Sequence, residues 1–195
     1  MTGDWLGARR TEVAVDRILD AAGQRFGRKD AATVGMHEIA SAAGCSRATL
    51  YRYFENRDAL YTAYVHRQSY RLYREIGAQI AARQDPRERL IEGILAALRN
   101  VRENPALASW FAARQRPIGG EMAEQSRVIK SLAEAFVTSL DTDEPDRAAD
   151  RARWLIRVMI SLLTFPGSDE ADERRMIEEF VVPTVLPVER VGHKP

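Results

Sequence analysis

Apolar residues recur at three- and four-residue spacing along most of the chain, which is the period of one face of an α-helix. The first clear stripe runs from Val15 to Phe26, and Gly27 marks its end. A second lies in 36–60, and further stripes follow down to Val181. The pattern predicts an all-α protein of about nine helices.

The segment 36–60 reads as a short helix, a tight turn, a second short helix and the start of a third. Gly44 stops the first helix because glycine readily takes the left-handed conformation at a helix exit, and Ser46 is suited to cap the next. In that second helix, Leu50 and Phe54 are four residues apart and are predicted to face inward. The inner face of the first helix is predicted to be Met36, Ile39, Ala40 and Ala43.

The outer face of the second short helix is then left with Arg47, Thr49, Arg52 and Tyr53. Two guanidinium groups can read guanine edges or clamp phosphates, hydroxyls can bond phosphates, and little acid lies nearby to repel DNA. A helix, a glycine turn and a basic helix together are what a helix-turn-helix DNA reader requires.

The match to a known family rests on fixed spacings over three helices and covers about 50 residues near the N-terminus. The matching segments are 17–22, Phe26, 39–40, 43–46, 49–54 and 57–60. This stretch resembles the N-terminal signature of the TetR/AcrR family of bacterial transcriptional regulators. The resemblance implies a helix-turn-helix DNA-binding domain over 1–60, with its motif at about 35–54, and a helical effector-binding and dimerisation domain over 61–195.

Three positions depart from the family pattern. Gly35 stands where a Ser or Thr cap is common, and Arg57 stands where lysine is common. Cys45 stands where valine is common, and it reads either as a small apolar residue in the turn or as a redox switch. Arg57 keeps its positive charge, so a phosphate contact stays among the expectations.

By position, the resemblance implies DNA contacts from the second short helix and its flanks. Arg47 is the first candidate for a base contact, and Arg52 and Tyr53 are further candidates. Phosphate contacts are expected from Ser46, Thr49, Tyr51, Tyr53 and Arg57. The expected function is a homodimeric repressor that binds a palindromic operator and is released from it by a small hydrophobic ligand.

Beyond this motif, the pattern predicts a long helix capped by Asn56 that connects the reader to the remaining chain. Residues 1–10 lack periodicity and are predicted to form a mobile arm, in which Arg9 and Arg10 either reach DNA or are solvated. Further helices are predicted from Pro86 to Asn104, over 106–113, over 122–140, over 147–165, and up to a break at Pro183. Breaks are predicted at 117–120, at 141–146 and at 166–167.

Aromatic residues on the middle helices are candidates for a ligand cavity. They are Trp110, Phe111, Phe136 and Trp154, with Arg114 available to pair an anionic group. The alternative is that these aromatic residues are simply core.

The helix over 147–165 is apolar nearly all round and must therefore be buried on every side. We predict that one side meets its own core and that the other meets a second subunit, with the last two helices pairing with their copies in a four-helix bundle. The predicted interface residues are Trp154, Val158, Leu162, Ile177, Phe180 and Val181.

Charge and composition agree with a DNA reader at the N-terminal end. The 195 residues carry a formal net charge of only +1, but residues 9–67 hold 10 Lys and Arg against 7 Asp and Glu, whereas residues 68–195 hold 19 against 20. One cysteine fits a reducing compartment, and neither a secretory signal nor an apolar run of membrane length is found. A soluble, cytoplasmic protein is expected.

Enzyme chemistry finds little support in the sequence. His37, His66 and His193 have no metal-ligand spacing, and there is no phosphate-cradling glycine loop, nucleophile elbow or redox dithiol. No cofactor or metal is expected. Two other classes stay open, namely an adaptor whose helix-turn-helix binds protein without a DNA target, and a small-molecule enzyme built in the helical domain.

Overall fold

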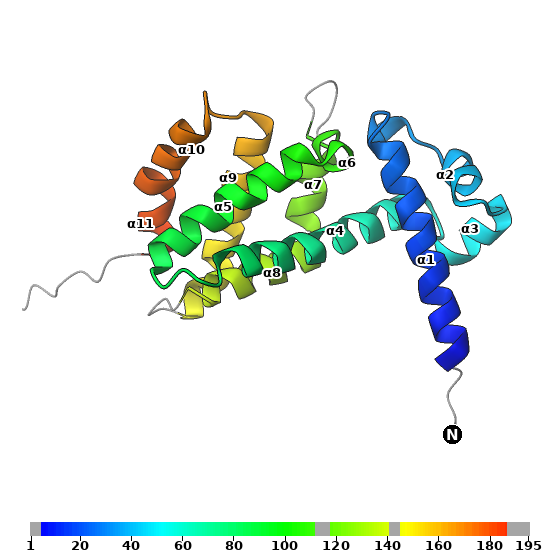
Figure 1. The fold of residues 1–195 in the computed structure, drawn as a ribbon, viewed down its shortest axis with the longest axis horizontal. Coiled ribbons are helices and arrows are strands. Elements are labelled where there is room, and N and C mark those ends of the chain that lie inside the picture. The colour runs from blue at the N-terminus through cyan, green and yellow to red at the C-terminus, as the bar shows by residue number, and fades with distance from the viewer. Residues whose placement is uncertain (1–4, 112–117, 141–144, 187–195) are drawn as a thin grey trace, which may run out of the picture.

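One long helix, α4 (Arg57–Ile80), links two groups of packed helices (Figure 1). The computed structural model describes residues 5–111, 118–140 and 145–186. The α-helices besides α4 are α1 (Trp5–Phe26), α2 (Met36–Ala43), α3 (Arg47–Tyr53), α5 (Pro86–Glu103), α6 (Pro105–Ala108), α7 (Ile118–Gln125), α8 (Arg127–Thr138), α9 (Ala148–Thr164), α10 (Glu170–Met176) and α11 (Val182–Val185). The remaining helical segments of the described residues are the 3-10 turns η1 (Ala31–Thr33) and η2 (Pro145–Arg147) and the π-helical turn η3 (Ile177–Val181). The all-α fold is confirmed.

The first group packs α1, α2, α3 and the N-terminal part of α4 around one apolar core. Leu50 from α3, Ile39 from α2 and Leu60 from α4 have no exposed surface. Asn56 caps α4 as predicted, its Oδ1 accepting the Ala59 N–H at 2.8 Å. Figure 1 shows α3 at the outer end of the molecule, next to α2, with which it shares this core.

The predicted mobile arm is wrong for residues 5–10, because α1 begins at Trp5. Residues 1–4 lie outside the described part of the chain. Ala8, Arg9 and Arg10 are strong helix formers, so the helix extends beyond the part that packs on the core. The pattern of apolar residues could not reveal the start of α1, since Arg9 and Arg10 are exposed and contribute nothing to the core.

The second group builds a separate core from α5, α8, α9 and the C-terminal helices. Asp85 and Pro86 open α5 as predicted, with the Asp85 carboxylate accepting the Arg87 N–H at 3.0 Å. Ile177 and Val185 have no exposed surface in this core.

Three boundaries in this group differ from the prediction. The expected helix over 106–113 is α6 and ends at Ala108, with residues 112–113 outside the described residues. The expected break at 117–120 is instead the start of α7, and the expected helix over 122–140 divides where Ser126 caps α8. Gly119 lies in the first turn of α7 and packs closely against Phe111, whose Cζ would be 2.9 Å from a Cβ there. This glycine permits close packing and does not end a helix.

The predicted break at Pro183 is also wrong. Residues 170–185 run as one helical rod because η3 is a π-type turn, in which the Val182 N–H bonds the Ile177 carbonyl five residues back. Pro183 has no N–H to donate and follows directly after this wider turn, so the helix continues through it.

An ion pair between a buried carboxylate and a half-buried guanidinium holds α10 against α5 and α9. Glu173 is 2% exposed and accepts from the Arg102 guanidinium at 2.6 and 2.8 Å and from the Gly167 N–H at 2.9 Å. Arg102 also donates to the Leu162 carbonyl at 3.0 Å, at the end of α9. The hydrogen bonds from Arg102 lower the pKa of Glu173 below its ordinary value.

We expect Glu173→Gln to lower the free energy of unfolding by about 2 kcal/mol at pH 7, because the charge-assisted hydrogen bonds to Arg102 are lost. A lowered carboxyl pKa adds stability above the unfolded pKa, and that stability is lost as the pH falls through the folded pKa. The deficit of the variant, measured by urea unfolding, should therefore shrink towards pH 4. A deficit that stays constant with pH would contradict this assignment.

Candidate functional site

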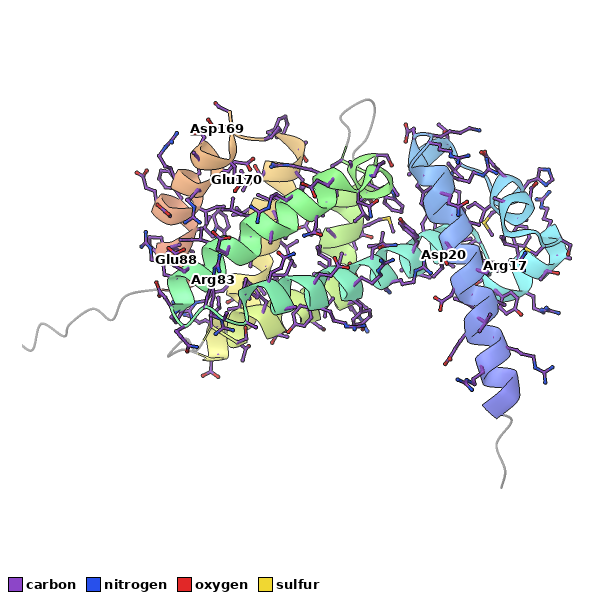
Figure 2. All side chains as sticks on the ribbon, viewed as in Figure 1. Arg17, Asp20, Arg83, Glu88, Asp169 and Glu170 are labelled. Atoms are coloured by element: carbon purple, nitrogen blue, oxygen red, sulfur yellow. The ribbon has the colours of Figure 1, made fainter. Side chains whose placement is uncertain are left out.

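The turn between α2 and α3 has the geometry that the sequence predicted. Gly44 takes the left-handed conformation with φ 65° and ψ 37° and ends α2. A Cβ at this position would lie 2.8 Å from Nη2 of Arg17, so the guanidinium of α1 packs directly on the turn. Figure 2 places Arg17 on the side of α1 nearest α3 and Asp20 on the side nearest α4, where Asp20 accepts from Arg67 at 2.8 Å. Glycine at this turn therefore satisfies both the backbone conformation and a close contact.

Local hydrogen bonds fix the start of α3. The Ser46 hydroxyl accepts the Thr49 N–H at 3.0 Å, and its Oγ lies 2.9 Å from Thr49 Oγ1. On the inner side Leu50 is fully buried and Phe54 is 6% exposed. The helix is therefore held at its cap and along its inner face, which leaves the opposite face open.

The open face of α3 is cationic. Arg47 and Arg52 are exposed, and each guanidinium lies over a neighbouring tyrosine ring, at 5.4 Å from the centroid of Tyr51 and 5.3 Å from that of Tyr53. The helix itself, RATLYRY, contains no carboxylate. Nearby Glu38 on α2 pairs with Lys29 at 2.9 Å. This face can bind an anionic partner and offers flat groups that stack or form paired hydrogen bonds.

Arg57 is placed differently from the other predicted contacts. Its Nη1 donates to the Ala32 carbonyl at 3.0 Å, and its guanidinium lies 5.3 Å from the centre of the Tyr61 ring. The Tyr61 hydroxyl in turn bonds the carbonyls of Ala31 and Val34, the latter at 2.8 Å. Burial raises the pKa of Tyr61 to about 12, so the hydroxyl stays a donor at neutral pH.

Arg57 and Tyr61 thus clamp the loop before α2, and the sequence analysis missed this function. A tyrosine facing the first core was a visible signal, but its carbonyl partners lie 27 and 30 residues away. The N-terminus of α2 beyond this loop has no side-chain cap, which agrees with Gly35 at the cap position.

A second basic surface adjoins α3. Arg9, Arg10 and Arg17 of α1 line a groove of about 420 Å³ together with the helix-turn-helix turn. Cys45 lies half-buried in this groove and packs against the first core. Arg17 was not among the predicted contacts, because its position relative to the turn depends on how α1 packs on α2.

A cavity of about 480 Å³ lies behind α4 in the second group. Trp110, Phe111 and Phe136 line it, together with residues of α4, α5, α7, α8 and α9. Trp154 does not line it, because its side chain is 45% exposed on the outside of α9, so the ligand contact predicted for Trp154 is not retained. Arg114 lies outside the described residues.

Trp110 belongs to the cavity wall and to the first core at once. Its ring centroid lies 5.5 Å from that of Phe26, 5.3 Å from that of Tyr61 and 6.2 Å from that of Tyr64. The indole is 2% exposed. Trp110 therefore lies between the cavity and the first core, around which α1, α2, α3 and the start of α4 pack.

The interface residues predicted on the last two helices divide into two sets. Leu162, Ile177 and Val181 are 5%, 0% and 4% exposed within one chain, so they belong to its own core and their assignment to an interface is wrong. Trp154 and Phe180 remain exposed, and Val158 is half-buried. The exposed apolar side chains of α9 and the C-terminal rod are Trp154, Phe165, Met176 and Phe180.

The described part of the chain offers neither a metal-binding cluster nor a membrane-spanning helix. No group of three or more His, Cys, Asp or Glu side chains is arranged to hold a metal ion among residues 5–111, 118–140 and 145–186. Within the same ranges, every helix is too short or too polar to cross a bilayer.

Comparison with known proteins agrees with this geometry. Residues 18–64 match the model of the bacterial regulatory proteins of the tetR family. The HTH-type transcriptional regulator Rv1255c of Mycobacterium tuberculosis is 60% identical over 191 residues, which are 98% of this chain and 95% of that protein.

Solved structures share the fold. The TetR family repressor AlkX from Dietzia sp. superposes with a TM-score of 0.65 at 25% identity, over 87% of this chain and 93% of AlkX. FadR of Thermus thermophilus superposes with a TM-score of 0.62 at 20% identity, over 93% of this chain and 98% of FadR. With its helix-turn-helix in place and a relative at 60% identity along nearly its whole length, the chain belongs to the TetR family of bacterial HTH-type transcriptional regulators.

Proposed function

We propose that the protein is a homodimeric repressor that binds a palindromic operator through α3 and is released when a small hydrophobic ligand enters the cavity. The observation that carries the DNA-binding half is the open face of α3, where Arg47 and Arg52 are exposed on a helix without carboxylates. Two such helices in one dimer would enter successive major grooves.

The contacts are assigned by position on this face. Arg47 is the principal base contact, with Arg52 and Tyr53 as further base contacts. Ser46, Thr49, Tyr51 and Tyr53 bind phosphates. Arg57 binds a phosphate through the guanidinium N–H groups that remain after its bond to Ala32, and Arg9, Arg10 and Arg17 extend the basic surface along α1.

The two subunits meet on the exposed apolar face of α9 and the C-terminal rod. This face consists of Trp154, Phe165, Met176 and Phe180, and it supports the predicted four-helix bundle with different residues turned to the partner. Exposed aromatic side chains at this density are typical of an interface core.

Ligand response is supported by the position of Trp110. A ligand in the cavity would touch the same indole that packs on Phe26, Tyr61 and Tyr64, so the cavity and the DNA-binding core share a residue through which binding can act. The structure of the neighbour FadR was solved in complex with lauroyl-CoA, which supports a small-molecule site in this fold. The ligand must bind the released conformation better than the DNA-bound one.

The first experiment is binding of the purified protein to DNA from beside its own gene, titrated against salt and competitor DNA. We expect specific binding, a palindromic footprint and an affinity that falls about 1,000-fold or more between 50 and 200 mM salt, because several phosphate contacts are made by each subunit. Weak, sequence-indifferent binding would refute the operator and favour the adaptor function.

A further inference from the structure

The cavity is elongated. It is lined at every third or fourth position of α4 from Val65 to Ile80 and by Ala81 just after that helix, so it follows one face of α4 for about 24 Å at 1.5 Å per residue. Its volume of about 480 Å³ is spread along this length, so the space suits an extended chain better than a compact ligand.

The lining is apolar and carries charge of one sign. Gly77 on α4 and Ala97 on α5 place little side-chain volume between the helices, whereas Gly93 makes room for Phe136, whose Cζ would lie 2.7 Å from a Cβ there. The charged residues among the described lining are Arg74 and Arg89, and no carboxylate lines the described wall. An anionic group is therefore the charged group that this cavity attracts.

The two ends of the cavity differ. Near the C-terminal end of α4, the lining residues Arg74, Gly77 and Ala81 are exposed, which marks this end as the mouth. The opposite end is closed by Trp110, which is 2% exposed. Arg89 already donates to the Ser139 carbonyl at 2.8 Å, whereas Arg74 has no hydrogen bond or ion pair to any described residue.

We propose that the ligand is a single unbranched aliphatic chain with an anionic head, inserted tail first so that the head binds Arg74 at the mouth and the tail approaches Trp110. This deepens the proposed function, on which it rests for the link between ligand and DNA. A longer tail reaches closer to Trp110 and hence to the DNA-binding core.

The test uses the purified full-length protein without DNA and a series of saturated straight-chain carboxylates, from octanoate to octadecanoate, each below its micelle concentration. We expect the Kd from calorimetry to fall by about fourfold for each added methylene until the cavity is filled, because each methylene leaves water. Cholate, a rigid fused-ring carboxylate, should bind weakly. An affinity independent of chain length, or cholate binding as tightly as the best chain, would overturn the proposal.

Two pairs of variants locate the chain. A Cβ added at Gly77 meets no atom within 4 Å, so this position at the mouth is open to a larger side chain. Gly77→Trp should therefore weaken long chains by about tenfold or more, which is the loss of two or more buried methylenes. The matched Gly77→Ala should stay close to the parent. Parent-like affinity in Gly77→Trp would place the chain elsewhere.

The head is tested by Arg74→Gln, with the exposed Arg71→Gln on the same helix as control. Arg74→Gln should weaken carboxylates by about fivefold and leave the matching primary alcohols unchanged, since only the ion pair is lost. Equal losses in both variants would refute the head position.

Failure of this proposal and failure of the regulator function give different results. Length-dependent binding without any operator would leave the chain site intact and refute the repressor. Specific operator binding by a protein that binds none of these chains would leave the repressor and refute the ligand class.

Discussion

Phe180→Asp is expected to convert the protein to a monomer and to weaken operator binding by about 100- to 10,000-fold, the range over which linked binding exceeds single-site binding. Phe180 is 61% exposed in one chain and belongs to the proposed interface together with the exposed Trp154 and Phe165. A carboxylate buried in the proposed interface would be unpaired, which disfavours association strongly. Sedimentation and operator titration measure the two effects.

The control is Tyr70→Asp, because Tyr70 is 53% exposed on α4 and lies outside the proposed interface. It should leave the dimer and operator binding close to the parent. Phe180→Asp should also keep its helical content and melting temperature, unlike Leu162→Asp, which buries a charge in the core of a single chain. A Phe180→Asp protein that remains dimeric would move the interface to another surface.

Arg47→Ala is expected to cost about 1 to 3 kcal/mol of operator binding, roughly 5- to 150-fold in Kd, and to relax the preference at one base pair in each half-site. Arg47 is exposed in the first turn of α3, where the inner residues are already fixed by Ser46 and Leu50. The dimer should be unaffected. Titration of the operator and of base-substituted operators measures both effects.

Two further variants separate base reading from charge. Arg47→Lys keeps the positive charge but loses the flat, paired donors, so it should retain binding to nonspecific DNA and lose discrimination at that base pair. Arg87→Ala removes the same charge from an exposed position at the start of α5 and should change little. If Arg47→Ala bound the operator as tightly as the parent, α3 would not be the recognition helix.

The DNA-reading unit could be predicted in detail because its signals are local. A left-handed glycine at Gly44, a cap at Ser46 and two inward residues at Leu50 and Phe54 each act within a few residues of their own position. Spacing of this kind therefore predicts a helix-turn-helix independently of what the rest of the chain does. The clamp by Arg57 and Tyr61 escaped prediction because its partners belong to a loop 25 to 30 residues away in the chain, on the far side of α2 and α3.

The apolar C-terminal helices were harder, for a physical reason. On α9, apolar residues occupy nearly every side, so the sequence could say that each must be buried but not against what. Packing decided that Leu162 meets its own core, that Ile156 and Ile160 line the cavity, and that Trp154 faces outward.

Taken by itself, the sequence determined the all-α class, the helix-turn-helix and its cationic face, since helix period, caps and turn glycines are encoded within a few residues of where they act. Only the tertiary structure decided which apolar faces form core, cavity or outer surface, and which tryptophan lies between the cavity and the core of the helix-turn-helix group. Burial depends on neighbours that are distant in the chain, and a hydrophobic side chain carries the same signal whichever of them it meets.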